Sequence, residues 1–97
     1  MSIRSDLPGA DLVSGGLADL AAGRETERAL LVAMAAPRLR SAGIEVPDDG
    51  YADERASPSH RLYALLSLAG DGAHSRYNAL VARMVSFLRA AERAREG

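Results

Sequence analysis

The chain of 97 residues contains no cysteine, no lysine and no tryptophan. Without cysteine, disulfide bonds, thiolate nucleophiles and cysteine-ligated zinc or iron–sulfur sites are excluded. Without lysine, a Schiff-base mechanism and the phosphate-binding lysine of a P-loop are excluded as well. Any chemistry must therefore depend on histidine, carboxylates, hydroxyls and arginine, and we predict neither a cofactor nor a bound metal.

Aromatic residues are also scarce, at 4% of the chain. The apolar residues are mainly alanine and leucine, which suit closely packed helices better than a sheet built from β-branched and aromatic side chains. A chain of this length has room for one hydrophobic core and no second domain. The composition therefore predicts an all-α protein with a single helical domain over residues 1–97.

The chain has no long apolar run. The longest, residues 29–37, is far too short to cross a bilayer. Residues 1–8 lack the apolar stretch of a secretory signal. We therefore expect a cytoplasmic protein without a membrane partner.

Charge is balanced overall but unevenly distributed, and the net charge is −1. Residues 1–56 carry ten acidic and six basic side chains, whereas residues 57–97 carry three acidic and six basic ones. Either the two halves complement each other, within the fold or between subunits, or the basic half binds an anionic partner. The overall charge gives no general attraction to nucleic acid, so we do not expect a nucleic-acid partner.

Apolar residues recur at helical spacing in four segments, over about 8–22, 25–42, 57–69 and 71–95. We expect the core to include Val13, Leu17, Leu20, Ala21, Leu30, Leu31, Met34, Ala35, Leu39, Leu62, Leu65, Leu66, Ala69, Tyr77, Leu80, Val81, Met84, Phe87, Leu88 and Ala91. The pattern predicts a four-helix, mostly antiparallel bundle with a kinked second helix and a long acidic loop between the second and third helices.

Glycine and proline punctuate these segments. Gly15 and Gly16 indicate either close approach of another backbone or a break, and we favour one continuous helix. Pro37 removes a backbone hydrogen bond and predicts a kink over 33–37. Gly23 is expected to end the first helix, and Gly43 followed by Ile44 is typical of a glycine C-cap with an apolar residue folding back on the last turn.

The only long connection spans residues 45–56 and holds five carboxylates. Such a cluster suggests a calcium site, but the segment lacks the alternating ligands of an EF-hand loop. We therefore expect a solvated acidic loop.

Both histidines lie in a repeated pattern. Ser57 precedes His60 by three residues, and Asp71 precedes His74 by three; a tyrosine follows each histidine three residues later. The pattern predicts two similarly capped helices, in which the histidine returns a hydrogen bond to the cap residue. A metal or acid–base site is the alternative, but about ten helical residues, roughly 15 Å, separate the histidines, so one subunit hardly brings both to one ion.

One polar group remains as a candidate site for an enzyme or ligand-binding protein: Asp71, His74, Arg76 and Tyr77 at the start of the fourth helix. A second alternative is nucleic-acid binding by a helix-turn-helix around residues 70–72. That fit is poor, because the following helix is extensively apolar and the protein is not basic.

Two apolar residues, Leu68 and Val85, do not fit the buried stripes of their helices. Exposed together, they would form a small apolar patch, which predicts a homodimer or a partner surface. The leading hypothesis is a small non-enzymatic interaction or assembly module of bacterial type with no catalytic residues, because no convergent catalytic set is apparent.

Overall fold

The computed structural model describes residues 7–47 and 58–96, and within them it contains helices and no strand. The five helices are α1 (Ala10–Ala21), α2 (Glu27–Met34), α3 (Ala36–Ser41), α4 (Pro58–Leu68) and α5 (Ala73–Glu96). The predicted all-α class is confirmed.

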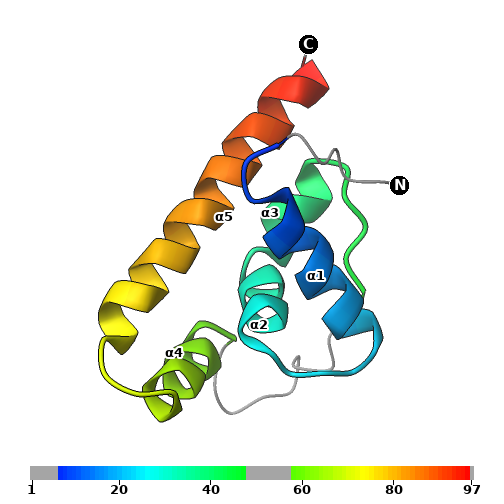
Figure 1. Ribbon diagram of the computed structural model, residues 1–97. Coiled ribbons are helices and arrows are strands. Elements are labelled where there is room, and N and C mark those ends of the chain that lie inside the picture. The colour runs from blue at the N-terminus through cyan, green and yellow to red at the C-terminus, as the bar shows by residue number, and fades with distance from the viewer. Residues whose placement is uncertain (1–6, 48–57, 97) are drawn as a thin grey trace.

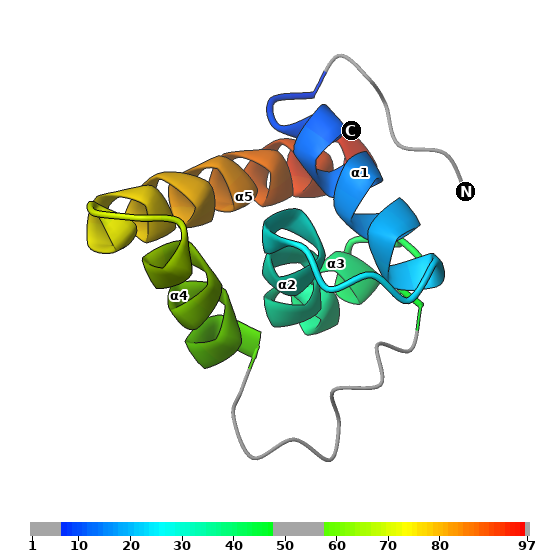
Figure 2. The same ribbon diagram turned by 60° about the horizontal axis from the view of Figure 1, so that its bottom comes forward.

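Helix α5 is the longest element, with 24 residues, or about 36 Å at 1.5 Å per residue. It runs along one side of the molecule, as Figure 1 shows, while α1 lies on the opposite side and α2 lies between them. Figures 1 and 2 both place α4 against the N-terminal end of α5 and not along its length. The helices therefore surround α2, and the antiparallel four-helix arrangement is not confirmed.

The predicted second helix is two helices, which is why the structure has five and not four. Helix α2 ends at Met34 and α3 begins at Ala36, with Ala35 between them. Pro37 has no N–H to bond Ala33, and its ring crowds the carbonyl of that residue. The chain therefore breaks the helix where the sequence predicted only a kink.

Two helix starts also differ from the prediction. Helix α1 begins at Ala10, after Gly9 in the left-handed conformation (φ 77°), and not at Pro8. Helix α5 begins at Ala73, so Gly72 and not Asp71 stands immediately before it. Ser57, the predicted cap of α4, lies outside the described residues, as does most of the predicted acidic loop.

Two helix ends follow the predicted glycine motif. Gly23 and Gly43 have positive φ values of 75° and 88°. The Arg24 N–H donates to the Asp19 carbonyl at 2.8 Å, and the Ile44 N–H donates to the Leu39 carbonyl at 3.0 Å. These bonds define Schellman motifs, and Ile44 is buried as predicted.

The core centres on α2, whose residues 29–33 are all buried. Two predicted core residues, Ala21 and Ala69, are exposed instead. The buried cluster consists of Ala10, Val13, Leu20, Ala29, Leu30, Leu31, Val32, Ala33, Leu39, Ile44, Leu62, Leu66, Met84, Phe87, Leu88 and Ala91. Because α1, α4 and α5 all bury their apolar faces around α2, this short helix determines where the surface hollows lie.

Candidate functional site

The contact between α1 and α2 depends on two glycines. A Cβ atom at Gly16 would lie 2.5 Å from both the Arg28 carbonyl oxygen and a methyl group of Val32. A Cβ atom at Gly15 would lie 2.5 Å from a nitrogen of the Arg28 guanidinium. At Gly16 only glycine allows the two backbones to come this close, whereas the group facing Gly15 is the end of a flexible side chain. Helix α1 is one continuous helix, as expected.

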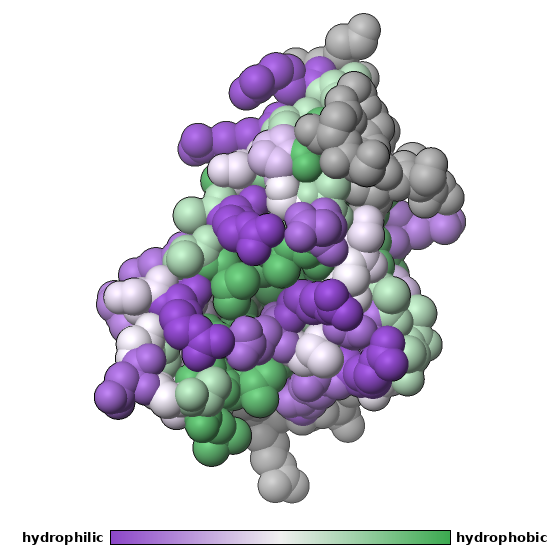
Figure 3. Space-filling model, in the orientation of Figure 1, coloured by the Kyte–Doolittle hydropathy of each residue, from purple (hydrophilic) through white to green (hydrophobic). Residues whose placement is uncertain are grey.

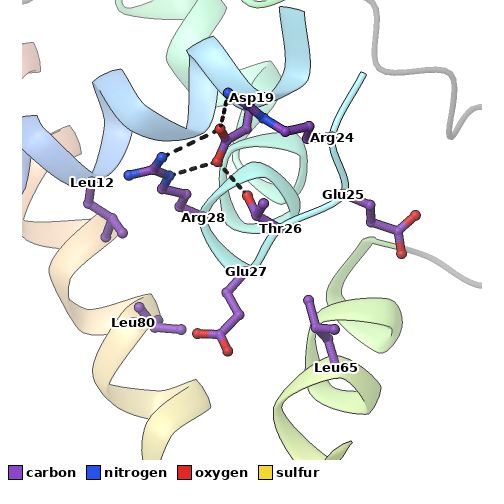
Figure 4. A pocket seen from close by; sticks show the side chains of 9 residues that line it. All are labelled: Leu12, Asp19, Arg24, Glu25, Thr26, Glu27, Arg28, Leu65 and Leu80. Atoms are coloured by element: carbon purple, nitrogen blue, oxygen red, sulfur yellow. Dashed lines mark hydrogen bonds and ion pairs between the residues drawn. The ribbon is translucent and has the colours of Figure 1, made fainter. Parts of the chain in front are cut away.

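Asp19 is the only buried charged residue in the described part of the chain, with 1% of its surface exposed. Figure 4 shows three side chains donating to its carboxylate. The Arg28 Nε atom lies 2.7 Å from Oδ2, the Thr26 hydroxyl lies 2.6 Å from Oδ2, and an Arg24 nitrogen lies 3.1 Å from Oδ1. The buried charge is therefore paired and hydrogen-bonded, as burial of an ion requires.

Thr26 links this cluster to the start of α2. Its hydroxyl donates to Asp19 and accepts a hydrogen bond from the Ala29 N–H at 3.1 Å. Thr26 is thus the N-cap of α2. One side chain fixes both the beginning of α2 and its position against α1.

The cluster keeps Asp19 ionised. Hydrogen bonds from Arg28 and then Thr26 hold the pKa of Asp19 well below its ordinary value, and the positive charges of Arg28 and Arg24 add to this effect. The same contact raises the pKa of Arg28. A carboxylate with so low a pKa is a poor proton acceptor near neutral pH, so the arrangement is suited to structure and not to general base catalysis.

Sequence reasoning missed this cluster. Asp19 lies three residues after Gly16 and therefore on the helix face that contacts α2. Arg24, Thr26 and Arg28 follow at alternate positions after the Gly23 helix end. The signal that could have identified the cluster was an acidic residue on a predicted buried helix face, followed after the helix end by two arginines and a threonine.

A hollow of about 740 Å³ lies beside this cluster, and α1, α2, α4 and α5 surround it. Figure 3 shows apolar surface in the middle of this face, framed by hydrophilic residues. Leu12, Leu65 and Leu80 supply its apolar side chains, as Figure 4 shows. Its volume suits a small molecule. However, the charged residues that line it already pair within the protein, which leaves few free polar groups to orient a ligand.

Ion pairs join the acidic and basic halves of the chain. An Arg83 nitrogen of α5 lies 3.5 Å from an Asp11 oxygen of α1, and an Arg76 nitrogen lies 3.3 Å from a Glu27 oxygen of α2. Arg61 of α4 also pairs with Glu25, which precedes α2. Part of the predicted complementarity between the halves thus lies within the fold.

The structure does not bring together the predicted polar group at the start of α5. Arg76 turns to Glu27, and the Tyr77 hydroxyl lies 4.0 Å from the Met34 sulfur. His74 is exposed, with Nε2 3.2 Å from the amide nitrogen of Asn78, and Asp71 is exposed before the helix. His74 and Tyr77 share Tyr63 as a neighbour, but Arg76 pairs with Glu27, so the four side chains are not brought together as one group.

Aromatic contacts connect α4 with the start of α5. The Tyr63 ring lies with its centroid 5.8 Å from that of Tyr77 and 6.5 Å from that of His74. His60 is exposed in the first turn of α4, three residues before Tyr63. Within residues 7–47 and 58–96, no three histidine or acidic side chains are placed to hold a metal ion.

A smaller groove of about 250 Å³ lies between the α2–α3 segment and α5. Arg38 is the only charged residue that lines it. The other lining residues are Leu31, Met34, Ala35, Pro37, Val81, Met84, Val85 and Leu88. We call this feature the α3–α5 groove. It is an almost wholly apolar depression, and the side chains of Met34, Val81 and Val85 that line it are half-buried.

The α3–α5 groove is bounded by polar contacts at both ends. At one end Tyr77 lies against Met34. At the other, Arg38 donates two hydrogen bonds to Glu92, with Nε 3.1 Å from Oε2 and Nη2 3.2 Å from Oε1. These bonds raise the pKa of Arg38 and tie α3 to the C-terminal part of α5.

The two predicted interface residues lie in different places. Val85 lines the α3–α5 groove, about 18 Å along α5 from Ala73. Leu68 is 85% exposed at the end of α4, near the N-terminal end of α5. They belong to separate surfaces, so Val85 alone lies in an apolar depression.

Comparison of the chain with protein-family models, with curated proteins and with solved structures finds no match. In the part of the chain that the structure describes, no helix is long and apolar enough to cross a membrane. Function must therefore be argued from the surfaces themselves.

Proposed function

We propose that the protein is a small non-enzymatic helical interaction module and that it binds a partner protein through the α3–α5 groove. The observation that supports this function is the lining of the groove, which is apolar except for Arg38. Methionine and other apolar side chains in a shallow depression are typical of the centre of a protein interface. They offer contact area to a partner without offering reactive groups.

The size of the groove favours a protein partner over a small molecule. Its volume of about 250 Å³ is below the roughly 300–1,000 Å³ of ligand pockets. A helix laid against a groove can place apolar side chains there at positions i, i+3 and i+4. The partner is therefore a helix that inserts a few apolar side chains between α3 and α5.

The charge distribution favours a protein over a nucleic acid. Three arginines of the basic half, Arg61, Arg76 and Arg83, already pair with carboxylates of the acidic half. Their charge is therefore partly neutralised for binding a phosphate backbone, which needs a concentrated basic surface. We place this module in the cytoplasm, as the sequence predicts.

Binding of a neutral amphipathic helical peptide tests this proposal, with leucines on one face and glutamine elsewhere. Backbone amide shifts measured by NMR are expected to change along α3 and around Val81 and Val85. Val85→Glu should abolish the changes, whereas Leu68→Glu, the same kind of change on an exposed apolar residue outside the groove, should leave them intact. Shifts that avoid the groove, or that survive Val85→Glu, would show the function to be wrong.

A further inference from the structure

Two arginines extend the edge of the α3–α5 groove along α5. Val85, Arg89 and Arg93 follow one another at intervals of four residues, so their side chains succeed each other along one side of the helix. Both arginines are exposed. The apolar groove therefore passes into a basic rim toward the C-terminal end of α5.

These two arginines differ from the other arginines of α4 and α5 whose side chains the structure describes. Arg61, Arg76 and Arg83 each pair with a carboxylate of the acidic half. Among the side chains that the structure describes, neither Arg89 nor Arg93 has an ion-pair partner. Of the α5 arginines with described side chains, the two without an ion-pair partner therefore lie beside the groove, whereas Arg83 lies on the face toward α1.

We infer that the occupant of the α3–α5 groove is an acidic amphipathic helix of a partner protein, whose apolar face contacts Val81 and Val85 and whose carboxylates face Arg89 and Arg93. This inference rests on the proposed function and names the chemistry of the partner. The two arginines lie about 6 Å apart along the helix axis, so two acidic residues one turn apart on the partner match them. Opposite charges placed in this way select the partner and its direction.

The same charges disfavour two other occupants. A basic helix would place like charges against Arg89 and Arg93, which costs free energy at an interface. In a symmetric dimer built on this groove, each subunit would bring the same basic rim to the interface, again with like charges close together. The carboxylate of Glu92 does little to neutralise this repulsion, because it is already paired with Arg38.

The test compares three versions of one helical peptide with the same leucine face and with glutamate, glutamine or lysine on the flanking positions. Fluorescence anisotropy at low ionic strength is expected to show the glutamate version binding roughly tenfold or more tighter than the lysine version. The difference should shrink as salt is added, because exposed charges are screened.

Substitutions in the protein show which residues cause the preference for the glutamate peptide. The double change Arg89→Glu and Arg93→Glu should reverse the preference between the glutamate and lysine peptides. Arg83→Glu makes the same charge change on the α1 side of the same helix and should retain the preference. Circular dichroism checks that each variant is folded, and Val85→Ala, a milder change than Val85→Glu, should weaken all three peptides alike.

The outcomes separate this inference from the function on which it rests. Equal binding of the three peptides at the groove would overturn the acidic partner and leave the interaction module standing. No binding of any peptide would overturn both. Light scattering that shows a dimer lost in Val85→Glu would assign the groove to a second copy of the chain and also overturn the inference.

Discussion

Helix α2 contacts its neighbours on two sides in different ways. Toward α1, Gly16 brings the backbones together with no room for a side chain, and beside this contact Asp19 pairs with Arg28. Toward α5, the larger side chains of Met34, Val81 and Val85 leave the α3–α5 groove open. We call the side of α2 that contacts α1 the closed side and the side that faces α5 the open side. The buried charge of Asp19 belongs to the closed side, where its role is structural. The surface that we propose for a partner is the apolar one on the α5 side.

Removing the buried carboxylate should have the largest effect on the closed side. Asp19→Ala leaves the guanidinium groups of Arg24 and Arg28 without their partner beside the core. Asp19 is buried but the Arg24 and Arg28 side chains are 63% and 49% exposed, so the cost lies in the lost hydrogen bonds to the charged carboxylate. We expect the melting temperature to fall by on the order of 10 °C. Thermal unfolding followed by circular dichroism measures the change.

Glu92→Ala is the matched control, because it also removes a carboxylate from a pair with arginine, but on an exposed site beside the groove. We expect a much smaller fall in melting temperature. Equal losses in the two variants would contradict the distinction between the closed side and the open side.

The glycines should show the next largest effect. Gly16→Ala places a Cβ atom against the Arg28 carbonyl and Val32, and neither can move without separating the helices. Overpacking of this kind costs about 1–3 kcal/mol, against a gain in helix propensity of up to about 1 kcal/mol. Urea unfolding should therefore show a net loss of stability.

Gly15→Ala is its neighbour and control. Its new Cβ atom would meet the Arg28 guanidinium, the far end of a flexible side chain that is half exposed. The side chain can shift, so the loss should be smaller than for Gly16→Ala. The reverse order would show that the arginine, and not the backbone approach, limits the contact.

The sequence allowed the open side to be predicted better than the closed one. Helical spacing identified the buried stripe of α5 from Met84 to Ala91, and glycine placement identified the ends of α1 and α3, because both signals are local. The Asp19 cluster joins residues from two helices and the turn between them. Its existence depends on how closely α1 and α2 approach, which no single segment specifies.

The same dependence on contacts between helices explains why the candidate functional residues were only partly predicted from the sequence. His74 and Arg76 are neighbours in sequence, but α5 turns Arg76 toward Glu27 while His74 stays exposed. Val85 was identified as unusual because it left the buried stripe, yet the groove around it needs α3, and the break at Ala35 that creates α3 was predicted only as a kink.

Lowering the pH should reduce the stability that the Asp19 cluster contributes to the folded protein. The pKa of Asp19 in the folded protein lies well below its ordinary value of 3.8. Above about pH 5 the carboxylate is ionised in both the folded and the unfolded state, and its contribution to stability is nearly complete. Below that pH the unfolded chain binds a proton that the folded chain does not, so stability falls as the pH falls.

Chemical unfolding of the wild type and of Asp19→Asn at pH 7, 4, 3 and 2 measures this contribution. The wild type should be the more stable at pH 7, and its advantage should narrow as the pH falls below about 5. An advantage that stays constant down to pH 2 would mean that the Asp19 pairs do not hold its pKa low.

The smallest effect is expected at the ion pair that ends the groove. Arg38 and Glu92 make two hydrogen bonds, but 47% and 36% of their side chains are exposed, so water and salt weaken the interaction. A double-mutant cycle with Arg38→Gln and Glu92→Gln should give a slight coupling in melting temperature that disappears in high salt. A coupling that persisted in salt would mean that the pair is shielded and holds α3 firmly to α5. The groove would then be rigid before any partner binds, and the open side would resemble the closed one in how its shape is fixed.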